Sequence, residues 1–182
     1  MLRYLASFGP ATATDVQTWS GLSRIKDVLQ PLRERLRTFR DERGRELFDL
    51  PDAPRPPADT AAPVRFLPDY DNLLLAHDDR TRVIADEHRG RIVLSANLRI
   101  LPTFLVDGFV AGTWTIERKK ASATLVIAPF AALSREARDR LAEEGEALLR
   151  FVEEDAGAFA VRFEKAGPLT RSRPSPRAAG RS

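Results

Sequence analysis

The chain of 182 residues is long enough for one large domain or two small ones, and an apolar content of 43% is ordinary for a globular protein. No apolar run approaches the roughly 20 residues that a membrane-spanning helix requires, and the N-terminus lacks the layout of a secretory signal. The absence of cysteine excludes disulfides, thiol catalysis and thiolate metal sites. Because His77 and His88 are the only imidazoles, we expect no metal and no cofactor.

The net charge of +3 is unevenly distributed along the chain. The last segment, from about residue 167 to 182, has no acidic residue and holds Arg171, Arg173, Arg177 and Arg181. Removing these four positive charges from the net +3 leaves −1 for everything before them. Any nucleic-acid-binding surface in the folded part must therefore be local.

Residues 1–50 carry the pattern of three helices and a hairpin. The first helix ends at Gly9-Pro10. A short second helix is expected to have Thr14 as its N-cap, with Val16 and Trp19 on a shared core face.

The third helix is expected to start at Ser23 and to be kinked or ended by Pro31. Its predicted inner face consists of Ile25, Val28, Leu29 and Leu32. A hairpin follows, formed by the runs LRTFRD and RELFDL around a turn at Glu42-Arg43-Gly44. This order of elements is that of a winged helix-turn-helix.

A boundary is expected in residues 51–63, because five prolines there indicate an extended linker. Residues 64–166 are predicted to form a second, β-rich domain of the α+β class, with strands in PTFLVD, GFVAGTWTIER, SATLVIAPF and AFAVRFE. A long amphipathic helix is expected from Ser134 to about Glu154, with an apolar stripe of Leu141, Leu148, Phe151 and Val152. Residues 167–182 have the composition of a disordered basic tail.

The strongest binding signal is an excess of four positive charges between Ser23 and Arg45. In a winged helix the third helix enters the major groove and the hairpin contacts a neighbouring groove or the backbone. The residues predicted to contact DNA are Ser23, Arg24, Lys26, Arg33, Arg37, Arg40, Arg43 and Arg45. The alternative is a solvated helix face in which these arginines pair with acids such as Asp27.

Two further groups of residues have a structural and a functional interpretation. The clusters Asp69-Tyr70-Asp71 and His77-Asp78-Asp79-Arg80 suit turns and helix caps, in which Asp71 or Asp78 would be the capping residue, better than acid–base catalysis. The basic tail is either a soluble terminus or a phosphate-binding arm. Trp114 is expected to pack in the sheet, with stacking on a base as the alternative.

Four separated segments resemble one family: FGPATATDVQTWSGL, LRTFRDERGRELFDLPDAP, FLPDYDNLLLAHDDRTRVI and LVDGFVAGTWTIE. They resemble the C-terminal half of the winged helix DNA-binding domain-containing proteins of actinobacteria, which include the AlkZ/YcaQ-like DNA glycosylases that excise alkylated purines and unhook interstrand crosslinks. The resemblance covers about residues 1–165. It implies tandem winged helices and a β-barrel-like domain that together hold double-stranded DNA.

The resemblance also limits what this chain is expected to do. Members of the family are typically twice as long, and their glycosylases carry a Gln-hydrophobic-Gln or Gln-hydrophobic-Asp motif in the part that has no counterpart here. Gln17-Thr18-Trp19 and Gln30-Pro31-Leu32 do not match that motif. We therefore expect no catalytic residue in this chain, a missing N-terminal half or second chain as a partner, and a cytoplasmic protein that is nucleoid-associated when bound to DNA. The alternative is a winged helix that binds protein or regulates transcription without a role in repair.

Overall fold

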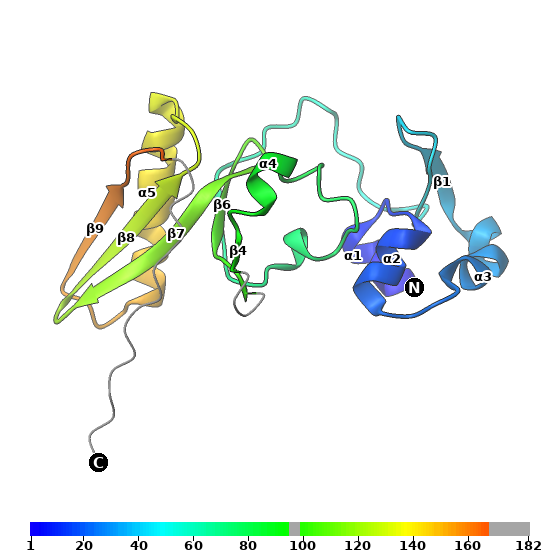
Figure 1. Ribbon diagram of the computed structural model, residues 1–182, viewed down its shortest axis with the longest axis horizontal. Helices are drawn as coiled ribbons and strands as arrows, with labels where there is room; N and C mark the ends of the chain where they lie inside the picture. Colours follow the sequence, from blue (N-terminus) through cyan, green and yellow to red (C-terminus); the bar gives the residue numbers. More distant parts are fainter. Residues whose placement is uncertain (95–98, 168–182) are drawn as a thin grey trace, which may run out of the picture.

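The computed structural model describes residues 1–94 and 99–167 (Figure 1). Residues 168–182, and with them almost all of the predicted disordered tail, lie outside this range. The first fifty residues form three helices and a hairpin. Their elements are α1 (Leu2–Phe8), α2 (Ala13–Ser20), α3 (Ile25–Leu29), the 3₁₀-helix η1 (Gln30–Arg35), β1 (Arg37–Arg40) and β2 (Glu46–Asp49).

Both predicted helix caps in this region are wrong by one or two residues. The N-cap of α2 is Thr12, because its hydroxyl accepts from the backbone N–H of Asp15 while the Asp15 carboxylate accepts from the N–H of Thr12. Helix α3 is preceded by Arg24 in a left-handed conformation, with φ of 60°. The prediction about Pro31 is confirmed, because the α-helix ends at Leu29 and the chain continues as a 3₁₀-helix.

A small core holds these elements together and consists of Tyr4, Leu5, Ala11, Val16, Ile25, Leu29, Leu36 and Phe48. Trp19 and Val28 are 47% and 48% exposed, so their predicted place in the core is wrong. The five-residue α3 buries only the narrow face that Ile25 and Leu29 share. The Trp19 ring instead lies on the outer side of α1, with its centroid 5.2 Å from that of Tyr4.

The rest of the described chain contains one large sheet, one long helix and several short elements. Residues 51–63 contain neither helix nor strand. The elements are β3 (Arg65–Leu67), the 3₁₀-helix η2 (Asn72–Leu74), α4 (Asp86–Arg89), β4 (Val93–Leu94), β5 (Arg99–Ile100), β6 (Thr103–Val106), β7 (Phe109–Lys119), β8 (Ser122–Pro129), α5 (Arg135–Val152) and β9 (Ala158–Phe163).

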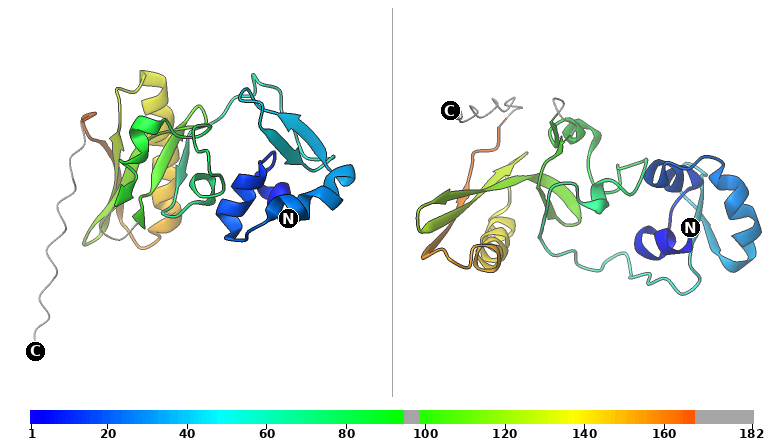
Figure 2. Two further views of the ribbon diagram at one scale, coloured as in Figure 1. Left: turned by 45° about the vertical axis from the view of Figure 1, so that its right-hand side comes forward. Right: turned by 90° about the horizontal axis from the view of Figure 1, so that it is seen from below.

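The five-stranded sheet has the order β3-β6-β7-β8-β9 and is mixed, because only β8 and β9 run parallel. It is an open sheet, so the expectation of a barrel-like domain is wrong. Within the described residues β3 and β9 are its two edges, and the three-residue β3 pairs only with β6. Helix α5 covers one face of the sheet (Figure 2). The apolar side chains of that face are therefore buried without closure of the sheet into a barrel.

Helix α5 begins after Ser134, within one residue of its predicted start, and the Ser134 hydroxyl accepts from the N–H of Ala137. Its buried residues recur every four positions at Ala137, Leu141, Gly145 and Leu149, and a Cβ on Gly145 would lie 2.5 Å from Leu125. Phe151 and Val152 fall outside this row and are 78% and 44% exposed, so their predicted place in the stripe is wrong. Trp114 packs in the sheet as predicted, since its indole N–H donates to the carbonyl of Leu67.

Candidate nucleic-acid interface

The turn of the β1–β2 hairpin is built by its own sequence, Asp-Glu-Arg-Gly-Arg. The Asp41 carboxylate accepts from the backbone N–H groups of Arg43 and Arg45, at 3.0 and 2.8 Å. Gly44 takes a φ of +74°, which side chains rarely tolerate. Arg40 donates across the turn to the carbonyl of Gly44 at 3.1 Å. Three exposed arginines therefore lie close together here, Arg40 at the end of β1 and Arg43 and Arg45 in the turn.

Several of the predicted contact residues have an acidic partner already. At the start of α3, the Arg24 guanidinium lies 2.7 Å from Asp27, which is the pairing that the alternative interpretation named. On η1, Arg33 lies 2.6 Å from Glu46 of β2. These pairs are largely exposed, and exposed pairs contribute little stability and exchange readily for another anion.

Other cations on this surface have no ion pair with a carboxylate in the part of the chain that the structure describes. Lys26 and Arg40 are exposed, on α3 and β1. The Arg37 guanidinium lies 5.2 Å from the centroid of Phe39. Arg55, which does have an ion pair, with Asp49 at 3.1 Å, lies 5.4 Å from the same ring. Ser23 is exposed beside Arg24 in the turn before α3. The predicted residues therefore lie on α3, on η1, on the hairpin and in the turn before α3, but they do not all share one face, because Arg37 and Arg40 lie on opposite faces of β1.

Residues that follow the predicted linker contact the hairpin through Asp79. Arg43 and Arg45 each place a guanidinium nitrogen 2.9 Å from the same oxygen of Asp79. Hydrogen bonds from the hydroxyl and N–H of Thr81, helped by the two arginines, lower the pKa of Asp79 to about 2. Asp79 is therefore ionised at neutral pH, and it neutralises part of the hairpin's charge.

Three further contacts fix residues 76–82 against the first two helices. The Tyr4 hydroxyl donates to the carbonyl of Ala76 at 2.6 Å, and burial and the nearby Asp15 raise the pKa of that hydroxyl. The N–H of Asp78 donates to Asp15 at 2.9 Å, and Arg82 donates to the carbonyl of Pro10 at 3.3 Å. The two parts of the chain are thus joined by direct contacts in addition to residues 51–63.

Asp15 and His77 form a buried pair within this junction. Both are at most 6% exposed, and Nδ1 of His77 lies 3.8 Å from Asp15. Arg82 lies 3.3 Å from Nε2 of the ring, and since a guanidinium can only donate, Nε2 is the acceptor in that contact. Burial alone would raise the pKa of Asp15, but the His77 ring, Thr12 and the N–H of Asp78 together hold it below its ordinary value.

The Asp15–His77 pair is buried and contributes to holding the 76–82 segment against α2. Other acids of the aspartate-rich segments make local contacts. Asp71 caps η2 by accepting from the N–H of Leu73, as predicted. Asp78 does not cap a helix, because its carboxylate accepts from the hydroxyl of Thr18. Sequence reasoning missed Asp15, whose one local signal was its position three residues after Thr12.

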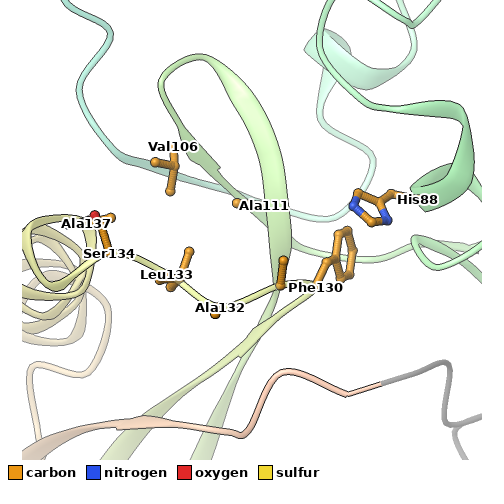
Figure 3. Close-up of a pocket in the computed structure, with 9 residues that line it drawn as sticks. His88, Val106, Ala111, Phe130, Ala132, Leu133, Ser134 and Ala137 are labelled. Carbon is orange, nitrogen blue, oxygen red and sulfur yellow. Dashed lines mark hydrogen bonds between the residues drawn. The ribbon is translucent and has the colours of Figure 1, made fainter.

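The described part of the chain has pockets on both of its halves. One, of about 480 Å³, opens on the candidate interface between the start of α2, α3 and β2. The other, of about 310 Å³, is mostly apolar and lies near the start of α5, where the rings of His88 and Phe130 face each other with centroids 4.7 Å apart (Figure 3).

In the described residues no group of three histidine or acidic side chains could hold a metal ion, and no described helix is long and apolar enough to cross a membrane.

Comparison of the sequence and structure with known proteins identifies the family of this chain. Residues 1–151 match the family described as DNA glycosylase AlkZ-like, so the chain belongs to the AlkZ-like DNA glycosylase family. Its structure is similar to that of DNA glycosylase AlkZ from Streptomyces sahachiroi, with a TM-score of 0.70 and 25% sequence identity. The match covers 90% of this chain and 44% of AlkZ, so the chain corresponds to less than half of that protein. No curated protein matches the sequence.

Proposed function

We propose that this chain is a DNA-binding unit of the AlkZ-like family, in which residues 1–50 form a winged helix that contacts duplex DNA. The order of three helices and a hairpin is that of a winged helix, with α3 as the recognition helix and the β1–β2 hairpin as the wing. Residues 51–63 would act as a linker and residues 64–166 as the second domain, held to the first through residues 76–82.

The observation that carries this proposal is the exposed basic surface of α3, η1 and the hairpin in a chain of this family. Positive charge gathers there although the chain before its final segment has a net charge of −1. Phosphate contacts from such a surface would supply most of the affinity. The residues proposed to make them, with base edges also within reach of α3, are Ser23, Arg24, Lys26, Arg33, Arg37, Arg40, Arg43 and Arg45.

We assign this chain a binding role and no catalytic one. The glutamine motif of the family's glycosylases is not present in these 182 residues, and the burial of Asp15 and His77, which are 5% and 6% exposed, supports a structural role for that pair. Base excision must also expose the glycosidic bond to activated water. Excision would therefore need an N-terminal half or a second chain, to which this chain contributes part of the DNA-binding surface.

A second candidate function is a winged helix that binds protein. The observation in its favour is that Asp79 already neutralises Arg43 and Arg45 at the tip of the hairpin. A surface with internally paired charge suits a protein partner better than a polyanion. Replacement of Asp79 distinguishes the two functions, because only a DNA-binding surface should then bind a duplex more tightly.

The replacement Asp79→Asn is expected to strengthen binding to a fully paired duplex about three- to tenfold at low salt. Freeing the two arginines adds about one phosphate contact, so the slope of log K against log salt concentration should steepen by about one. Fluorescence anisotropy of a labelled duplex measures both quantities. Asp59→Asn changes the net charge equally in the exposed 51–63 segment and should leave both unchanged. Absence of binding in the intact protein would favour the protein-binding function.

A further inference from the structure

The pocket on the candidate interface is lined by apolar and polar residues. Its volume is about 480 Å³, which lies in the range of small-molecule sites and can hold a nucleotide. Ala13 supplies partly exposed apolar surface, whereas Leu29 and Phe48 also line the pocket but are only 1% and 5% exposed. The polar residues that line it are Thr12, Thr14, Lys26, Gln30, Arg45, Glu46 and Asp78. Asp78 comes from the 76–82 segment, so the pocket is complete only when the two parts of the chain are joined.

The charges of this pocket disfavour a phosphate group. Arg45 is paired with both Asp41 and Asp79, and Glu46 is paired with Arg33. Lys26 and Asp78 remain, with opposite charges, so the pocket has little net attraction for an anion. A phosphate would also approach the carboxylates of Glu46 and Asp78. The exposed cations around the pocket are better placed for backbone phosphates outside it.

The same residues suit a flat, neutral group that carries both donors and acceptors. The Gln30 amide can donate and accept, Lys26 can donate to a ring nitrogen or carbonyl, and Asp78 can accept from an amino group. The partly exposed Ala13 leaves room for a flat ring beside these groups. Nucleobases have this combination of an aromatic face and a mixed hydrogen-bonding edge.

We infer that this pocket holds a single unpaired nucleobase of bound DNA. The inference rests on the proposed DNA-binding function and adds to it what the surface recognises. A paired base is stacked in the duplex, whereas an unpaired base can leave the stack at small cost. The pocket therefore makes the protein a reader of unpaired bases, and it needs no catalytic group to do so.

The test compares two labelled duplexes of one sequence, of which one contains a single unpaired adenine in a bulge. We expect the intact protein to bind the bulged duplex about tenfold more tightly than the paired one, as measured by anisotropy. The replacement Gln30→Trp fills the pocket from an exposed position and should reduce this ratio to about one, while the paired duplex is still bound. Thr14→Tyr, at a second exposed residue that lines the pocket, should do the same.

The chain offers a matched control in its other glutamine. Gln17 is exposed on α2 and does not line the pocket, so Gln17→Trp should keep the tenfold ratio. Circular dichroism confirms that each variant is folded. Equal binding of the two duplexes by the intact protein overturns the inference, as does a ratio that survives in both pocket variants or is lost in Gln17→Trp. Failure to bind the paired duplex contradicts the DNA-binding function itself.

Discussion

Replacing Asp15 with alanine is expected to lower the free energy of unfolding at neutral pH by about 3 kcal/mol, which is the largest stability effect that we predict. Asp15 is 5% exposed and accepts from the N–H and hydroxyl of Thr12 and from the N–H of Asp78. Its removal leaves these donors unpaired and His77 without its neighbouring charge. Urea unfolding followed by tryptophan fluorescence measures the loss, and Asp52→Ala at an exposed position should change the stability little.

The loss should depend on pH in a defined direction. The pKa of Asp15 is lowered in the folded protein, so its carboxylate stabilises the fold above the ordinary carboxyl pKa of about 4. As the pH falls below that value, the unfolded chain takes up the proton first and the contribution decreases. The difference between the original protein and Asp15→Ala should therefore shrink between pH 7 and pH 3. A constant difference over this range would contradict the charged role of Asp15.

The second large effect is expected on DNA affinity. Replacing Lys26, Arg40 and Arg43 together by alanine removes cations from α3, the strand and the tip of the hairpin. Each phosphate contact contributes about 0.9 to the salt slope, so the slope should become smaller by about two to three. Affinity for a paired duplex at low salt should fall roughly a hundredfold, as measured by anisotropy.

A control with the same loss of charge separates local contact from overall electrostatics. Lys120, Arg135 and Arg140 are exposed, and Figure 1 shows α5 at the opposite end of the molecule from β1. Their joint replacement by alanine should change the affinity less than threefold. If the two triple variants lost affinity equally, the effect would come from net charge and the assignment of the α3–hairpin surface would be wrong.

Local sequence patterns predicted most of the helices and strands but few of the details that depend on partners. The hairpin turn was predictable because Asp41 and Gly44 act within five residues. The exposure of Trp19 and Phe151 was not, because periodicity shows which residues share a face and not whether another element covers it. The open sheet differs from the barrel-like expectation for the same reason, since closure depends on how distant edge strands meet.

The sequence predicted the cationic side chains of the candidate site but not the acidic side chains that pair with them. The excess of charge between Ser23 and Arg45 is visible in the sequence, whereas Asp79 reaches Arg43 and Arg45 from more than thirty residues away. The resemblance to the family was confirmed because several separated segments carried it together. The proline-rich run suggested a separation of two domains, but the contacts of residues 76–82 join them.

The α3–hairpin surface is tested most directly by the binding of a fully paired duplex to a protein that ends at Gly167, so that the arginines of the final segment cannot contribute. We expect this shortened protein still to bind, with a slope of log K against log salt concentration of roughly −3 to −5. Loss of binding on shortening, or a slope near zero, would show that the α3–hairpin surface does not hold DNA.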